Sequence, residues 1–138
     1  MIKRIALSLA FTLLTAGPAL ATNYIAPANL KKMLDAKQEV ILVDIQPAAD
    51  FAKHHLPGSI ETNAFPAKSD EEKARLNKTL PAINASKAQV IVLCPRGKSG
   101  AKNSYEYLQS KGVPETRLQI LEGGIADWPY AGMFVKGR

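Results

Sequence analysis

The sequence has 138 residues, of which 46% are hydrophobic and 22% are charged, and its formal net charge is +6. This length suits one domain with one hydrophobic core and is too short for two. Basic and acidic residues are intermixed and no basic stripe carries interleaved aromatics, so we expect no nucleic-acid partner. The single cysteine excludes an intramolecular disulfide and a CxxC dithiol site, and with only two histidines it argues against a metal site.

The N-terminal residues have the layout of a secretory signal peptide. Lys3 and Arg4 form a basic head before a long apolar run, and residues 19–21 (ALA) supply a small-x-small cleavage pattern. A Gly-Pro pair interrupts the run, whereas a membrane helix needs about 20 apolar residues. We therefore predict that residues 1–21 are a cleaved signal peptide and that residues 22–138 form a single periplasmic domain with no membrane partner.

Short apolar runs and helix-like segments alternate in the first half of the chain. Residues 27–34 predict a helix that begins at a proline and places its apolar side chains on one face. The run VILVD at residues 40–44 is typical of a strand covered on both faces, as in a parallel sheet. A short helix at residues 47–53 and a brief strand at residues 59–63 follow.

The second half continues the alternation. Ser69 and Glu72 have the spacing of a capping box and predict the start of a helix. Residues 89–93 (QVIVL) predict a second buried strand, residues 100–111 a helix that ends at a glycine, and residues 117–121 a third strand. This order predicts an α/β domain with a parallel sheet.

Cys94 follows the second buried strand directly and precedes a helix. Ligands of parallel sheets bind beyond the carboxyl ends of the strands, which is where this cysteine stands. The loop around Gly97 can turn its backbone N–H groups inward, and Arg96 and Lys98 add positive charge, so the loop can bind an anion and stabilise a thiolate. A buried, inert cysteine before a solvated turn is the alternative that the residues alone leave open.

Three segments resemble the hallmarks of rhodanese-like domains and occur in the order of that family. They are VILVDIQPAADFAKHHLPGSIETNAFP (40–66), VIVLCPRGKSGAKNSYEYLQSKG (90–112) and LQILEGGIADWPYAG (118–132). The resemblance implies a three-layer α/β domain, with a central, mostly parallel sheet flanked by helices. It also implies sulfur transfer without a cofactor: a loop cysteine takes sulfur from an anionic donor such as thiosulfate, carries it as a persulfide, and passes it to a thiol or cyanide.

The resemblance also implies roles for the residues of the loop. Cys94 would be the nucleophile. The substrate anion and the persulfide would be held by Arg96, Gly97, Lys98, Ser99 and Gly100. Related phosphatases need a Cys-x5-Arg pattern, and Gly100 stands at the arginine position, which argues against a phosphatase.

The chain departs from the family pattern at three places: after Asp44, at His54, where the family usually has glycine, and at Pro95. Many members have arginine two residues after the aspartate that ends the first strand, but here Asp44 is followed by Ile45 and Gln46, which removes an ion pair. Asp44 could support the site from behind or cap the next helix, and both readings stay open. Pro95 has no N–H, so the loop has one donor fewer.

Other residues have simpler interpretations. His54 and His55 are expected to be turn histidines rather than catalytic bases, and residues 123–124 (GG) to form a tight turn near the loop, with Trp128 packed beneath it. Two alternatives to the enzyme remain: a persulfide carrier or binding module with little small-molecule turnover, and an idle interaction domain. The expected partners are an anionic sulfur donor, a thiol or cyanide acceptor and, for a carrier, a protein acceptor.

Overall fold

A five-stranded parallel sheet forms the centre of the domain. The computed structural model describes residues 21–138, and the predicted signal peptide lies outside the described residues except for its last residue. The strands are β1 (Tyr24–Ile25), β2 (Val40–Asp44), β3 (Ile60–Glu61), β4 (Gln89–Leu93) and β5 (Leu118–Leu121). Their order is β1-β5-β4-β2-β3, and every pair is parallel, which confirms the predicted α/β class.

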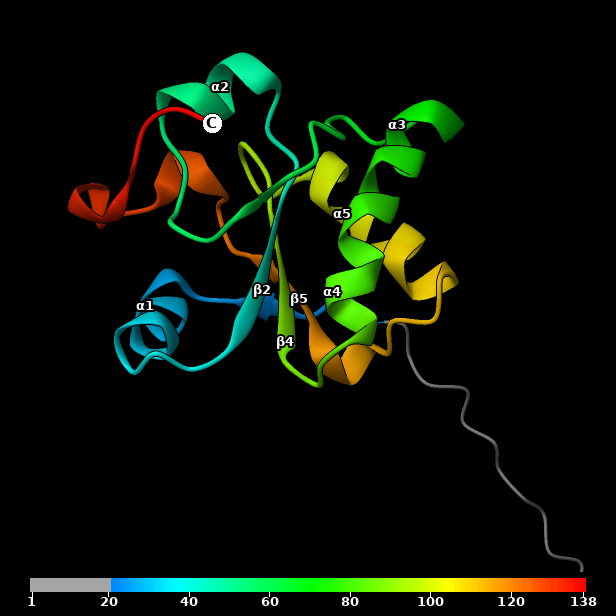
Figure 1. The fold of residues 1–138 in the computed structure, drawn as a ribbon, viewed down its shortest axis with the longest axis horizontal. Helices are drawn as coiled ribbons and strands as arrows, with labels where there is room; N and C mark the ends of the chain where they lie inside the picture. The colour runs from blue at the N-terminus through cyan, green and yellow to red at the C-terminus, as the bar shows by residue number, and fades with distance from the viewer. Residues whose placement is uncertain (1–20) are drawn as a thin grey trace, which may run out of the picture.

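Helices cover both faces of the sheet and make the domain three-layered (Figure 1). They are α1 (Pro27–Asp35), α2 (Ala48–Lys53), α3 (Asp70–Ala74), α4 (Leu80–Asn84) and α5 (Ser99–Ser110), with short 3-10 helices at Arg75–Thr79, Glu115–Arg117, Ile125–Asp127 and Ala131–Met133. In Figure 1, α1 lies on one side of the sheet, α3, α4 and α5 lie on the other, and α2 lies beyond the end of β2. Within residues 21–138, no helix has both the length and the apolar character needed to cross a membrane.

The side chains of the central strands alternate between two cores, because successive residues of a strand point to opposite faces. Val43 of β2 and Val92 of β4 pack in the core that α4 and α5 cover. Leu42 and Ile91 pack in the core that α1 covers. All four side chains are at most 2% exposed, and burying each one stabilises the fold by about 1.5–3 kcal/mol. The continuous apolar runs are therefore the consequence of a sheet covered on both faces.

The two edge strands differ from the prediction: β1 was not predicted, and β3 is shorter than expected. β1 has only two residues, Tyr24 and Ile25, which pair with Ile120 and Leu121 of β5. Two residues are too few to show the alternation of apolar and polar residues that predicts a strand. The strand expected at residues 59–63 is limited to Ile60–Glu61, because β3 pairs with β2 only at these two positions.

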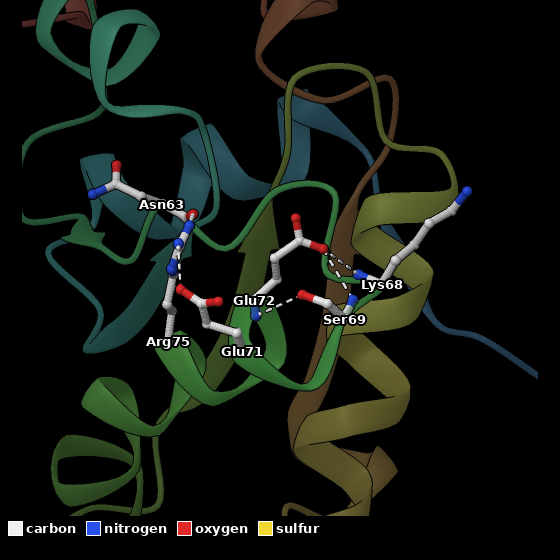
Figure 2. A network of polar contacts seen from close by, with 6 residues as sticks. All are labelled: Asn63, Lys68, Ser69, Glu71, Glu72 and Arg75. Carbon is white, nitrogen blue, oxygen red and sulfur yellow. Dashed lines mark hydrogen bonds and ion pairs between the residues drawn. The ribbon is translucent and has the colours of Figure 1, made fainter.

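The predicted capping box begins α3. Ser69 Oγ accepts a hydrogen bond from the Glu72 N–H at 3.1 Å, and Glu72 Oε1 accepts one from the Ser69 N–H at 3.0 Å (Figure 2). Arg75 follows this turn, pairs with Glu71 and donates from Nη1 to the carbonyl oxygen of Asn63 at 3.0 Å. These contacts join α3 to the segment that leaves β3.

The C-terminal residues return to α2 and β3, which the sequence did not indicate. His55 and Val135 exchange two backbone hydrogen bonds of 3.0 and 2.9 Å, forming an antiparallel bridge. The side chain of Arg138 pairs with Glu61 of β3 at 3.1 Å. This return holds the last residues against α2 and β3.

Candidate active site

Cys94 lies at the base of a loop that curls around its sulfur. β4 ends at Leu93 and α5 begins at Ser99, and the thiol side chain between them is 1% exposed. Its Sγ accepts a hydrogen bond from the Gly97 N–H at 2.6 Å. Gly97 has φ +69°, a conformation that favours glycine, and this reversal turns the N–H toward the sulfur. The loop thus presents a backbone donor to the one cysteine of the chain.

A second segment holds this loop from the side. The N–H of Ile125 donates to the carbonyl oxygen of Cys94 at 2.8 Å, and the N–H of Ala126 donates to that of Pro95 at 2.9 Å. Gly124 has φ +66°, and a Cβ built on it would lie 2.6 Å from the Gly97 nitrogen. The predicted glycine turn beside the loop is confirmed, and the close approach of the two backbones explains why it contains glycine.

Cys94 lines a cavity of about 410 Å³ that opens to the surface. The cavity is lined by Pro47, Asp50, Phe65, Cys94, Pro95, Arg96, Lys98, Ser99 and Gly100. Arg96 and Lys98 are exposed, and neither has an ion-pair partner within residues 21–138. Their charges are therefore available to an anion in the cavity, since exposed cations without a partner attract anionic ligands.

The structure brings all the predicted loop residues to one place. Arg96, Lys98, Ser99 and Gly100 line the cavity with Cys94, whereas Gly97 contributes its N–H to the sulfur from behind the lining. Their roles in binding a substrate stay predictions. Figure 1 shows why they meet here: the loop joins the carboxyl end of β4 to α5.

Three lining residues were not predicted from the sequence. Pro47 and Asp50 come from the segment after β2, and Phe65 comes from the loop after β3. The only signal for Pro47 and Asp50 is that they also follow the carboxyl end of a parallel strand. Phe65 had no such signal, although it is a large apolar side chain that is 39% exposed.

Phe65 closes the space next to Gly100. A Cβ built on Gly100 would lie 2.8 Å from Cδ2 of the Phe65 ring and 3.5 Å from Cδ1 of Ile45. Without a shift of the ring, this position has no room for a side chain. The arginine that a Cys-x5-Arg phosphatase places here is thus absent from the sequence, and its space is occupied.

Asp44 lies behind the site and does not line the cavity. It is fully buried, and its two carboxylate oxygens accept hydrogen bonds from Gln46, from the backbone N–H at 2.8 Å and from Nε2 at 3.0 Å. The idea that Asp44 caps the next helix is wrong, because Pro47 stands at the N-cap of α2 and no side chain caps that helix. The carboxylate instead holds Gln46 at the rear of the site.

Burial is the main influence on the Asp44 carboxyl. It raises the pKa of Asp44 to about 6, while the hydrogen bonds from Gln46 act in the opposite direction. Gln46 stands where many family members have arginine, so Asp44 receives a neutral amide in place of a cation. The Gln46 amide keeps the hydrogen bond, but because it is neutral it cannot offset the energetic cost of burying the Asp44 charge.

The two histidines have structural contacts. The His55 ring stacks on Phe51 with centroids 3.8 Å apart, and its Nδ1 lies 2.9 Å from the Phe51 carbonyl oxygen. The His54 ring packs against Phe134, and neither histidine lines the Cys94 cavity. Within the described part of the chain, no group of three or more His, Cys, Asp or Glu side chains is arranged to hold a metal ion.

Fold and site together define a class of protein: a three-layer parallel α/β domain with a thiol in a loop that also carries two exposed cations. The family model of the Rhodanese-like domain matches residues 26–130. The chain therefore belongs to the rhodanese-like domain family.

Solved structures share the fold at low identity. Protein BH2092 from Bacillus halodurans is 22% identical, with a TM-score of 0.62 over 83% of this chain and 77% of its own. A yeast protein described as a tyrosine phosphatase of the rhodanese family is 18% identical, with a TM-score of 0.61 over 79% and 86%. A thiosulfate sulfurtransferase from Pseudomonas aeruginosa is 21% identical, with a TM-score of 0.63 over 85% of this chain and only 20% of its own.

Proposed function

We propose that this protein is a sulfurtransferase that moves sulfane sulfur from thiosulfate, or a similar anionic donor, to a thiol or cyanide through a persulfide on Cys94. The observation that supports it most directly is the position of the Cys94 sulfur. The Sγ accepts a hydrogen bond from the Gly97 N–H at 2.6 Å, and Cys94 lines a cavity that Arg96 and Lys98 also line. A nucleophilic thiolate and an anionic donor need the same surroundings, namely N–H groups and positive charge.

The reaction has two displacements at sulfur. In the first, the Cys94 thiolate attacks the outer sulfur of thiosulfate, the sulfur–sulfur bond of the donor breaks, and sulfite leaves with the bonding electrons. In the second, the acceptor attacks the outer sulfur of the persulfide, and the electrons of that bond return to Cys94 Sγ. Arg96 and Lys98 would hold the donor, and the Gly97 N–H would stabilise the negative charge on Sγ before and after each transfer.

A phosphatase activity is less well supported, although one relative of similar fold is described as a tyrosine phosphatase. Phosphate-ester hydrolysis of this type depends on an arginine that binds the phosphate in a bidentate way. Position 100 is glycine, and Phe65 occupies the space beside it. The loop therefore lacks the arginine with which such phosphatases bind the phosphate.

A persulfide carrier is the second candidate, and Pro95 favours it. Proline has no N–H, so the loop offers one donor fewer to an anion or a persulfide. A weaker anion site would slow turnover of small donors while leaving Cys94 able to accept sulfur from a partner protein. Both candidates need the same cysteine and differ in the rate with small molecules.

Export to the periplasm is part of the proposal. Its support is the basic head, apolar run and small-x-small pattern of residues 1–21. Cell fractionation combined with N-terminal sequencing tests it: the periplasmic form should begin at Thr22. Recovery of the uncleaved chain in the cytoplasm would contradict this part of the proposal.

Thiosulfate:cyanide sulfurtransferase activity of the purified protein, with Cys94→Ser as the comparison, tests the function. Thiocyanate formed by the wild type and not by the variant would establish the enzyme. Intact mass after thiosulfate treatment separates the candidates, because a gain of one sulfur atom without turnover indicates a carrier. Absence of both signals would overturn both candidates.

A further inference from the structure

A second hollow adjoins the Cys94 cavity. It has a volume of about 190 Å³ and is open to the surface. It shares Asp50, Pro95 and Arg96 with the Cys94 cavity, and the rest of its lining is Gln46, His54, Ile125 and Ala126. A ligand could therefore occupy both spaces at once, with one end at the sulfur and the other in the second hollow.

The boundary between the two spaces is held by main-chain contacts. The Ala126 N–H donates to the Pro95 carbonyl oxygen at 2.9 Å, which fixes the loop against the segment that lines the second hollow. On the other side, Gln46 is held by two hydrogen bonds to Asp44. Gln46, Pro95 and Ala126 are thus held in place before a ligand arrives, as is common for small-molecule sites, while the Asp50 and Arg96 side chains are free to adjust to it.

The Asp50 carboxylate, which this hollow shares with the Cys94 cavity, does not suit the sulfur donor. Asp50 places a carboxylate beside a cavity whose donor is an anion, and its one ion pair within residues 21–138 is to the exposed Lys53 at 4.0 Å. Such a distant surface pair contributes little. Asp50 would repel thiosulfate, so its position at the junction of the two spaces is better explained by another ligand.

The same residues suit a group that carries both charges. Gln46 Nε2 donates to Asp44 and to the carbonyl oxygen of His54, and no described residue donates to Gln46 Oε1. Gln46 Oε1 and the Asp50 carboxylate are therefore acceptors for an ammonium group. Arg96, which lines the same hollow, offers a guanidinium to a carboxylate.

We propose that the second hollow is an acceptor subsite that binds the amino-acid end, ammonium and carboxylate together, of a short peptide thiol. The proposal rests on the proposed function, because it assigns the class of acceptor for the Cys94 persulfide. The thiolate of the bound acceptor attacks the outer sulfur, the persulfide bond breaks with its electrons going to Cys94 Sγ, and the acceptor leaves as its own persulfide. No net oxidation or reduction takes place.

Binding of S-methylglutathione tests the subsite without turnover, since this probe has the two charged groups but no free thiol. Isothermal titration should give a dissociation constant at least tenfold higher for Ala126→Phe, whose ring would fill the hollow. The matched control is Ala49→Phe, because Ala49 is exposed on α2 and lines neither space. This control should bind the probe as the wild type does.

A charge test identifies the role of Asp50. N-acetyl-S-methylglutathione lacks the ammonium group, and we expect the wild type to bind it about tenfold more weakly than S-methylglutathione. Asp50→Asn should bind the two probes equally. A wild type that does not distinguish them, or an Asp50→Asn variant that still does, would overturn the proposal.

Activity measurements separate failure of the subsite from failure of the proposed function. With thiosulfate as donor, Ala126→Phe should lower the ratio of kcat/KM for glutathione to kcat/KM for cyanide about tenfold, and Ala49→Phe should leave the ratio unchanged. An unchanged ratio in Ala126→Phe, with normal cyanide turnover, would overturn the subsite alone. If the wild type shows no turnover with cyanide but binds the probe as predicted, the proposed sulfurtransferase function is overturned and the binding site is established.

Discussion

The backbones of Gly97 and Gly124 lie in close contact beside Cys94, where the turn after β5 meets the reactive loop, residues 94–98 between β4 and α5. A Cβ built on Gly97 would lie 3.0 Å from the Gly124 nitrogen, and one built on Gly124 would lie 2.6 Å from the Gly97 nitrogen. Both residues have positive φ, at +69° and +66°. The curl that brings an N–H to Cys94 therefore depends on a turn that follows a different strand, β5.

Gly124→Ala should disrupt this contact. The new methyl group would also lie 2.7 Å from the Arg96 nitrogen, and the positive φ adds backbone strain, so the loop must move. We expect sulfurtransferase kcat/KM to fall at least tenfold and the free energy of unfolding to fall by about 1–3 kcal/mol. Steady-state kinetics and urea unfolding measure the two effects.

Gly132→Ala is the matched control for this substitution. No heavy atom lies within 4 Å of a Cβ built on Gly132, and its φ is not in the left-handed region. Activity and stability should stay close to those of the wild type. If Gly132→Ala and Gly124→Ala had equal effects, the contact between the two backbones would not be what shapes the loop.

Arg96→Ala and Lys98→Ala should each weaken binding of the donor. Both cations line the cavity and have no ion-pair partner among the described residues, so we expect their charge to act on an anionic donor. We expect each substitution to raise the KM for thiosulfate about tenfold, or about 1.4 kcal/mol, with a smaller effect at high ionic strength. Lys87→Ala, an exposed lysine before β4 at the opposite end of that strand, should leave this KM unchanged. A rise in KM that does not depend on salt would speak against an electrostatic role.

Asp44→Asn should change how stability depends on pH. Burial raises the pKa of Asp44 from 3.8 to about 6, so the folded chain binds more protons than the unfolded chain between these values. The protonated carboxyl contributes its full stabilisation to the free energy of unfolding below about pH 4. This contribution, about 3 kcal/mol, is lost as the pH rises through about 6. The free energy of unfolding of the wild type, relative to Asp44→Asn, should therefore fall by about this amount between about pH 4 and about pH 7.

Urea unfolding of both proteins across this pH range measures the difference. A difference that does not vary with pH would show that Asp44 has an ordinary pKa. A difference that grows in favour of the wild type as the pH rises would show that the pKa is lowered, and that Gln46 stabilises the carboxylate more than burial destabilises it.

Ser69→Ala should destabilise the start of α3. The hydroxyl accepts the Glu72 N–H at 3.1 Å, and its loss leaves this donor to water. We expect a cost of about 1 kcal/mol in thermal or urea unfolding, with activity unchanged, because the capping box does not touch the cavity. Thr116→Ala is the control, since the Thr116 side chain makes no hydrogen bond with the described residues and is exposed. Equal costs for the two substitutions would remove the capping box as the cause.

Local chemistry made several features predictable. The runs at residues 40–44 and 89–93 form β2 and β4 with the predicted limits, because an uninterrupted apolar strand is stable only between two covering layers. The capping box is a contact between residues three apart, so Ser69 and Glu72 specify it without help from the rest of the fold. Cys94 was placed at the strand end by the same reasoning.

Long-range contacts were not predictable in the same way. Phe65 reaches Gly100 from a different loop, and the N–H groups of Ile125 and Ala126 reach the reactive loop from the segment after β5. Asp44 is an example: its position at the end of a strand allowed two roles, and only the positions of Pro47 and Gln46 in the structure distinguished them.

The parallel α/β class, the two central strands and the cysteine loop at the end of β4 can be predicted from the sequence alone, because these features depend on patterns within a few residues. Which side chains join Cys94 in its cavity, and what shape the loop takes, depend on how distant segments pack together. The order β1-β5-β4-β2-β3 brings loops from β2, β3 and β5 around the end of β4. Contacts between segments so far apart in the chain leave no periodic trace in the sequence, since they are set by how the strands pack side by side.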